Sequence, residues 1–427
     1  MIKDIVSRLY PLYRTIVSDD LDRGLEVVGE FMPHSSDYRM EEFNCGEARW
    51  TWEVPHRYHV EDAYLEIEHG ERVADFKKNP LHLVSYSQPI ERVMSWEQLA
   101  PHLHVSTKRP GAIPWVFKYY EKTWGFCISK NIYDRLPRDK KYRAVIRSEF
   151  RKKPGLKLGM GIVHPEGGPT PERGEIIVSA HICHPLQAND NASAVAVAVE
   201  AARRLAEKPL PAGSSSVRFL FPPETVGSVC YLSAHEDLIP RLKAGIVCES
   251  IGNRNSLAVQ HSWPGGALID RVADAVLKKR VPDHRSLAAW TVFSADEKVI
   301  NGPGVSVPTI MLTRAPYEEY HTSDDNLEII DEGLLQEDAS VMVEVIRMMA
   351  TNYTPQRTFR GPVHLSRSGL WIDYQKDRQL SLAMQQAMLY FEGKHTVFDI
   401  AEALKTDYWV MWELVERYRS KGFVIAS

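Results

Sequence analysis

The part of the sequence that most constrains the fold runs from Gly174 to Asn352, where short apolar segments alternate with longer helical patterns. The segments EIIVSAH, SVRFLFP, AGIVCES and VSVPTIMLTR have the length and composition of buried strands. Apolar residues between and after them recur with helical spacing. This alternation predicts an α/β domain with a mixed, mainly parallel central sheet flanked by helices.

The rest of the chain predicts additional regions around this sheet. Residues 1–33 have the pattern of one or two amphipathic helices. The segment after Trp50 contains short alternating runs, aromatic residues and prolines, which favour a β-rich inserted subdomain. A hairpin is expected to begin near Lys141. The C-terminal segment predicts three helices and a short final strand, the pattern of a winged helix. The expected domains are an α/β domain of residues 1–49 and 141–352, an insert of residues 50–140, and a winged helix of residues 365–427.

Composition bears on partners and location. The net charge of −4 provides no basic field for binding nucleic acid, and residues 365–427 contain eight Lys or Arg against eight Asp or Glu. The aromatic helix in that region instead favours packing against another domain or against a second copy in a homo-oligomer. Five scattered cysteines are typical of reduced thiols, and we find no signal peptide or membrane-spanning segment. We therefore expect a cytoplasmic protein that contacts neither membranes nor nucleic acids.

Polar side chains that can bind metals follow the predicted strands where each strand ends. In parallel sheets these ends meet at one edge, so we expect the side chains to lie close together. Imidazole and carboxylate groups are zinc ligands, and an aspartate can bridge two metals. Each residue alone has an ordinary structural alternative, such as capping of the following helix by Asp190. The converging residues are His181, Asp190, Glu224, Glu249 and His321.

The order of these residues resembles the co-catalytic zinc aminopeptidases of the bacterial leucyl aminopeptidase type. NDNASA is similar to the Asp-Asn-Ala-Ser-Gly helix start of that family, and YHTSDDNL is similar to its His-Thr-x-x-Asp element. The whole chain resembles a bacterial branch that adds a β-rich insert and a C-terminal winged helix. The resemblance implies a zinc aminopeptidase-like fold.

The resemblance also implies a set of metal ligands. His181 would bind one zinc and His321 the second, and Asp190 would bridge them. Glu249 stands where the family usually has an aspartate. The family holds the bond equivalent to Asp190–Asn191 in the cis form.

Four further residues receive roles from the same resemblance. Glu224 would be the general base that takes a proton from the attacking water. Asp325 would orient one of the metal ligands without itself binding the metal. Tyr320 or Tyr317 would stabilise the developing oxyanion.

Thr225 departs from the family, which has a second zinc-binding glutamate directly after the general base. One carboxylate fewer leaves more repulsion between two metals. We therefore expect one tightly bound zinc at His181, Asp190 and Glu249, and a second site that is weak or completed by another ligand. Glu297 and His184 are the candidates for that ligand.

Cys183 is a second departure, because the family has an aspartate two residues after the first ligand histidine. The thiol would share a face with His181 only if the strand continued that far. We expect it to pack in the interior, with soft metal ligation as the alternative.

The expected function is that of a zinc-dependent hydrolase. The preferred candidate is an aminopeptidase that removes an N-terminal residue from a small peptide or peptide-like metabolite. The alternatives are a zinc-dependent deacylase, amidohydrolase or cyclase in glycan or metabolite biosynthesis, and a non-catalytic scaffold or regulator. A retained general base argues against the scaffold.

Overall fold

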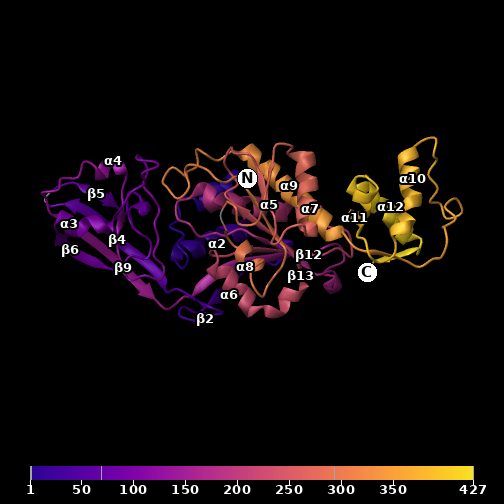
Figure 1. Ribbon diagram of the computed structural model, residues 1–427. Helices are drawn as coiled ribbons and strands as arrows, with labels where there is room; N and C mark the ends of the chain where they lie inside the picture. Colours follow the sequence, from indigo (N-terminus) through magenta and orange to yellow (C-terminus); the bar gives the residue numbers. More distant parts are fainter. Residues whose placement is uncertain (1, 69, 293, 427) are drawn as a thin grey trace.

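The centre of the protein is a mixed eight-stranded sheet in the order β1-β10-β12-β11-β13-β16-β14-β15. It is seen in a computed structural model that describes residues 2–68, 70–292 and 294–426. Figure 1 shows this sheet and its helices in the middle of an elongated molecule. The strands are β1 (Arg39–Phe43), β10 (Leu156–Val163), β11 (Glu175–Ser179), β12 (Ser216–Phe221), β13 (Leu242–Glu249), β14 (Ala258–Gln260), β15 (Arg285–Leu287) and β16 (Thr309–Thr313).

The four central strands β12, β11, β13 and β16 run parallel to one another. Every residue of β11, β12 and β16 is buried, as expected for strands that helices cover on both faces. Antiparallel pairing joins β10 to β12 on one side and β14 to β16 on the other. The predicted mixed sheet is confirmed, and its parallel part is the centre.

Helices cover both faces of the sheet (Figure 1). Helix α5 consists mainly of alanine and valine, and these small side chains let it pack closely against the strands. One face carries α1 (Ile2–Leu9), α2 (Asp19–Phe31), α5 (Ala194–Glu207), α7 (Leu268–Arg280) and α9 (Glu332–Thr351), and the other carries α6 (Val226–Ala234) and α8 (Glu297–Ile300).

A separate antiparallel sheet in the order β5-β4-β9-β6 lies at one end of the molecule (Figure 1). Its strands are β4 (Arg57–Ile67), β5 (Arg72–Asp75), β6 (Ile90–Met94) and β9 (Tyr142–Arg151). Shorter elements accompany it, namely β7 (Leu103–His104), β8 (Phe126–Cys127), α3 (Trp96–Leu99) and α4 (Lys130–Tyr133). The short strand β2 (Ala48–Arg49) pairs with β3 (Trp52–Glu53) and lies against α6 of the α/β domain. We call residues 50–151 the β-rich region.

The hairpin predicted near Lys141 is wrong. Strand β9 pairs with β4 and β6, whereas β10 pairs with β1 and β12 in the main sheet. Pro154 and Gly155 lie between the two strands. Proline has no backbone N–H to donate, which disfavours continued strand pairing at this point. The β-rich sheet therefore extends to Arg151, beyond the boundary predicted at residue 140.

The C-terminal region, residues 365–427, contains the three predicted helices at the opposite end of the molecule (Figure 1). They are α10 (Arg378–Ala387), α11 (Val397–Ala403) and α12 (Tyr408–Ser420). The final strand β18 (Val424–Ala426) pairs with β17 (Pro355–Arg357), which lies between the expected α/β domain and the expected winged helix. Assignment as a winged helix and oligomerisation through it stay predictions. Over the described ranges, no helix combines the length and apolarity needed to span a membrane.

Candidate metal centre

The register of the central strands brings their carboxyl ends together. Ser179, the last residue of β11, lies beside Leu220 of β12 and Val247 of β13. Glu249, the last residue of β13, lies beside Thr313 of β16. The loops that leave these four strands therefore start at one edge, and they carry the predicted site residues.

A first triad forms at this edge from His181, Asp190 and Glu249. The Nε2 atom of His181 lies 2.9 Å from Oε2 of Glu249 and 3.5 Å from Oδ1 of Asp190. All three residues are at most 2% exposed. Tetrahedral zinc with bonds of about 2.0–2.2 Å places its ligand atoms about 3.3–3.6 Å apart. The 3.5 Å separation lies in that range, whereas the 2.9 Å separation is that of a direct ion pair and would have to widen to admit the metal.

A second triad consists of His184, Asp190 and His321. Oδ2 of Asp190 lies 3.1 Å from Nε2 of His321 and 3.8 Å from Nε2 of His184. The two carboxylate oxygens of Asp190 thus face different triads. The peptide bond between Asp190 and Asn191 is cis, as the resemblance implied.

Two buried polar atoms of the triads lack hydrogen-bond partners within the described residues. They are Oδ1 of Asp190 and Nε2 of His321. Buried polar groups in folded proteins are almost always satisfied, so an exception needs an explanation. A cation held between imidazole nitrogens and carboxylate oxygens would satisfy both atoms, and the donor set is one that zinc accepts.

The ionisation of these groups follows from their burial. Burial raises the pKa of Glu249 to about 8, and the carboxylate of Asp190 adds to the rise while His181 opposes it. Burial also lowers the pKa of His184 well below its ordinary value, which keeps the neutral form that can bind a metal. Burial opposes ionisation of Asp190, but the three imidazoles around it hold its pKa below the usual range.

Glu224 lies beside the second triad on the turn that follows β12. Its Oε2 atom is 3.7 Å from Nε2 of His184, and its Oε1 atom is 3.6 Å from the ammonium of Lys298. The turn is held in place because the Thr225 backbone N–H donates to Asp296 Oδ1 at 2.8 Å. Burial raises the pKa of Glu224. Thr225 has a φ of 62° and leads directly into α6.

Asp325 binds the backbone of the loop that carries Asp190 and, among the described residues, does not contact a histidine ring through a hydrogen bond. Its carboxylate accepts hydrogen bonds from the N–H groups of Asn189 and Asp190 at 2.6 and 3.1 Å. It also accepts the hydroxyl proton of Tyr317 at 2.6 Å. Because that proton is already donated, the predicted oxyanion role does not fit Tyr317. Tyr320 is 40% exposed, and its ring stacks on His321 with centroids 3.8 Å apart.

Glu297, one candidate for the missing ligand, belongs to none of the groups of close metal-binding side chains in the described residues. It begins α8, which packs against β13 and β16. Its Oε2 atom instead accepts the N–H of Ala295 at 2.8 Å. The structure brings the other candidate, His184, into the cluster.

Cys183 is buried behind the two histidines. Its Sγ atom lies 3.3 Å from Nδ1 of His184 and 3.9 Å from Nδ1 of His181, whereas the Nε2 atoms face the carboxylates. It also accepts the N–H of Glu224 at 3.1 Å. Strand β11 ends at Ser179, so Cys183 does not share a strand face with His181. His181, Cys183 and His184 nevertheless form a third group of side chains that could hold a metal, so ligation by Cys183 stays a prediction.

Sequence reasoning missed several residues that hold the site together. The side-chain amide of Asn191 donates to Oε2 of Glu249 at 3.1 Å, and its oxygen accepts the N–H of Ser250. The buried guanidinium of Arg14 donates to the carbonyls of Ile182 and Gln187. The NDN motif pointed toward Asn191. No local pattern marked Arg14, because its partners lie far away in the sequence.

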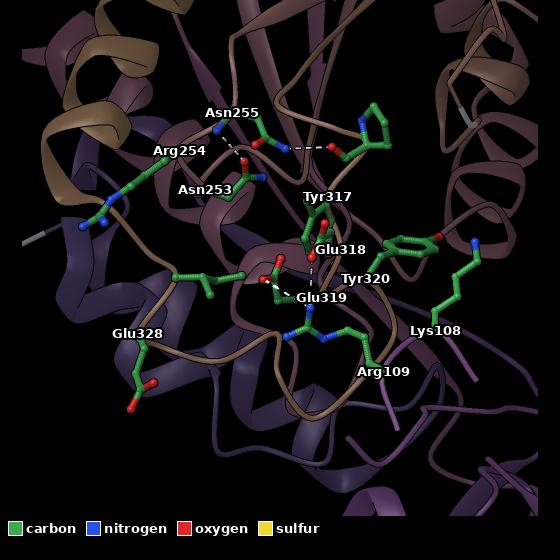
Figure 2. Close-up of a pocket in the computed structure, with 12 residues that line it drawn as sticks. Lys108, Arg109, Asn253, Arg254, Asn255, Tyr317, Glu318, Glu319, Tyr320 and Glu328 are labelled. Carbon is green, nitrogen blue, oxygen red and sulfur yellow. Dashed lines mark hydrogen bonds and ion pairs between the residues drawn. The ribbon is translucent and has the colours of Figure 1, made fainter. Parts of the chain in front are cut away.

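A cavity of about 1030 Å³ has Tyr317 and Tyr320 in its wall. No triad residue lines it, but Tyr320 stacks on His321 and so connects the cavity to the second triad. Figure 2 shows that the lining side chains come from several loops and that Arg109 reaches toward Glu318 and Glu319. Most of the lining is charged or carries an amide, and only Pro316 and Ile329 are aliphatic. The lining residues are Lys108, Arg109, Asn253, Arg254, Asn255, Pro316, Tyr317, Glu318, Glu319, Tyr320, Glu328 and Ile329.

Comparison with known proteins places the chain in a family. The model of a domain of unknown function, DUF4910, matches residues 3–352. The chain belongs to the DUF4910 family. It is also 30% identical over 411 residues to a Clostridium acetobutylicum protein provisionally named a polysaccharide biosynthesis protein with an aminopeptidase-like domain. The alignment covers 94% of this chain and 90% of that protein.

Solved structures share the fold of this DUF4910 chain. A crystal structure from Clostridium acetobutylicum, provisionally named a peptidase, has a TM-score of 0.85 and 27% identity, and the match covers 100% of this chain and 96% of that one. The zinc aminopeptidase BSAP from Bacillus subtilis has a TM-score of 0.61 and 16% identity, with 81% and 94% covered. The fold is thus peptidase-like. Together with the triads, these similarities support a hydrolase and suggest zinc as its metal.

Proposed function

We propose that this DUF4910 protein is a zinc-dependent hydrolase that cleaves amide bonds, with removal of an N-terminal residue as its first candidate reaction. The observation that carries the proposal is the pair of triads that share Asp190, with the Glu224 carboxylate 3.7 Å from His184. A metal site without chemistry has no need of such a carboxylate.

In this proposal His181, Asp190 and Glu249 hold one zinc, and His184, Asp190 and His321 hold the other. His184 takes over the task that the resemblance assigns to a second glutamate, where this chain has Thr225. A neutral imidazole in place of a carboxylate leaves the second site with less negative charge. We therefore retain the expectation that the second metal binds more weakly.

When bound, zinc would lower the pKa of a water molecule toward about 7 and polarise the substrate carbonyl. Glu224 would accept the proton of the attacking water and pass it to the leaving amine. Lys298, 3.6 Å from Glu224, favours the ionised form of that base. Asn191 and Asp325 keep Glu249 and the Asp190 backbone in place through their hydrogen bonds. Tyr320, stacked on His321, is the remaining tyrosine candidate for stabilising the oxyanion.

The cavity lined by Tyr317 and Tyr320 favours a second candidate reaction, deacylation of a polar amide such as an N-acylated amino sugar. Its volume of about 1030 Å³ exceeds the needs of one aliphatic side chain, and its lining offers donors and acceptors of both charges (Figure 2). Burial of a leucine side chain against charged groups would cost their desolvation. The name of the Clostridium acetobutylicum relative, which refers to polysaccharide biosynthesis, agrees with this candidate.

The two candidates are separated by a substrate panel tested on the zinc-loaded protein. The panel contains dipeptides with a free N-terminus, the same dipeptides N-acetylated, and N-acylated amino sugars. Release of amino acid only from the free dipeptides supports the aminopeptidase, and release of acid from the sugars supports the deacylase. Failure of every substrate, with metal absent from the purified protein, would contradict the proposed hydrolase.

A further inference from the structure

The β-rich region contributes a segment to the metal centre. Residues 113–115 run antiparallel to residues 321–323, with a bridge between Pro114 and Thr322. The N–H of Trp115 donates to the carbonyl of His321 at 2.7 Å, and the N–H of Ser323 donates to the carbonyl of Ile113 at 2.8 Å. The backbone of one triad residue is therefore held by the β-rich region.

The side chain of Trp115 contacts the rings of both histidines in the second triad. Its ring centroid lies 4.3 Å from that of His184 and 4.7 Å from that of His321, and the two imidazoles are themselves 5.3 Å apart. The planes of Trp115 and His321 meet at 75°, an edge-to-face arrangement. Trp115 is only 3% exposed, so the space beside both imidazoles is filled by the indole.

The indole is itself fixed from behind. Its Nε1–H donates to Oγ of Ser85 at 3.3 Å, and Ser85 lies 3.0 Å from the hydroxyl of the buried Tyr13. Ser85 belongs to the β-rich region, whereas Tyr13 precedes α2 of the α/β domain. The ring that contacts the two imidazoles is therefore anchored by both parts of the molecule.

We propose that Trp115 is a positioning residue, which holds His184 and His321 in the orientation that the second metal requires. This inference rests on the proposed function, because it assumes that the second triad binds a metal. The indole fills the space beside both rings, so neither imidazole can turn into that space without displacing it. In the described part of the chain Trp115 makes no ring contact with His181, whose ring centroid lies 4.5 Å from that of His184. The metal at the first triad should therefore depend less on this residue.

The test is titration of Co²⁺ into the chelator-treated, full-length chain, followed by visible absorption of the bound cobalt and by calorimetry. Residues that contact the metal ligands without binding the metal typically contribute about 10–100-fold to metal affinity. We expect Trp115→Leu to weaken the second cobalt site by at least about tenfold and to remove its absorption bands, and to weaken the first site much less. Trp115→Phe keeps a ring beside the imidazoles and should weaken the second site less.

Trp124→Leu is the matched control. Trp124 is a half-buried tryptophan of the same β-rich region, and it stacks on His102 with centroids 3.8 Å apart. This variant also loses a contact between a tryptophan and a histidine ring, here a parallel stack, and should keep both cobalt sites. If Trp115→Leu and Trp115→Phe both bind two cobalt ions with wild-type affinity and spectra, Trp115 does not position the ligands. If the wild-type chain binds no cobalt, the proposed metal centre itself is wrong, and the inference falls with it.

Discussion

The carboxyl edge of the main sheet and the C-terminal region satisfy their polar groups in different ways. At the edge, His184, Thr225, Ser250 and His321 are non-glycine residues with φ between 46° and 104°. Asp190 Oδ1 and His321 Nε2 are buried there without hydrogen bonds. Backbone strain and buried polar atoms without hydrogen bonds each destabilise the folded state. Packing by the rest of the fold must therefore hold these residues in place.

The C-terminal region is built from ordinary stabilising contacts. Thr396 and Asp399 form a capping box at the start of α11. Half-exposed ion pairs join the region to α7, with Arg271 bonded to Asp399 at 2.7 Å and to Glu402 at 2.6 Å. Buried side-chain atoms without a partner also occur elsewhere, for example in Asp22 and Asp62, but among the described residues none belongs to the C-terminal region. The comparison teaches that the edge where chemistry is proposed keeps unsatisfied buried groups, whereas the C-terminal region contributes to stability through satisfied ones.

Glu224→Gln should have the largest effect on activity and almost none on stability. Loss of a general base typically lowers rate by about 10²–10⁴-fold, so kcat/KM should fall by that range. Glutamine has nearly the same shape, so the metal content and melting temperature should stay at wild-type values. Kinetics and elemental analysis of the same preparation measure both. Wild-type kcat/KM in this variant would exclude Glu224 as the general base.

His184→Ala should change the number of bound metals. The variant removes a ligand of the second triad but leaves the first intact. Zinc per chain, measured with free zinc in excess because the second site is weaker, should fall from near two to near one. The loss of second-site zinc also removes the stability that its binding adds, which thermal unfolding with and without chelator will measure. His164→Ala is a suitable control, because His164 is half-buried and bonds Ser216 away from the triads. An equal zinc content in both variants would exclude His184 as a ligand.

Arg109→Gln should lower both stability and activity, and its effect on activity should be smaller than that of Glu224→Gln. Arg109 donates to Asp324 at 2.7 Å and lies 3.3 Å from Glu318, and so ties the β-rich region to the loop that carries His321. We expect the free energy of unfolding to fall by about 1 kcal/mol and kcat/KM to fall less than in Glu224→Gln.

The matched control for Arg109 is Arg143→Gln, in which an exposed arginine of β9 loses its bond to Glu91. Its kcat/KM should not change. An equal loss of activity in both variants would mean that the contact made by Arg109 has no special relation to the site.

Arg271→Ala should have the smallest effect. The arginine is 40% exposed, and exposed ion pairs contribute about 0–1 kcal/mol. Chemical denaturation should show a loss within that range, and kcat/KM should not change. A clear loss of activity would break the contrast between the two regions and connect the C-terminal region to catalysis.

The sequence by itself determined which strands form the centre and which polar residues follow them. The apolar runs and the helical spacing between them are local signals, and parallel strands must bring their carboxyl ends to one edge. This reasoning placed His181, Asp190, Glu249 and His321 together, and the structure brings them together, although their roles as ligands stay predictions.

Only the tertiary structure decided how the edge is completed. Nothing in the sequence near His184 distinguished it from Glu297, because the choice depends on which loop turns toward Asp190. Trp115 and Arg14 reach the site from other parts of the chain through contacts that leave no periodic pattern. Strand β9 likewise joined the β-rich sheet because its partners lie there, whereas a local pattern favoured a hairpin with its neighbour. Local propensity is a property of a few adjacent residues, but pairing and ligand geometry depend on where distant segments pack.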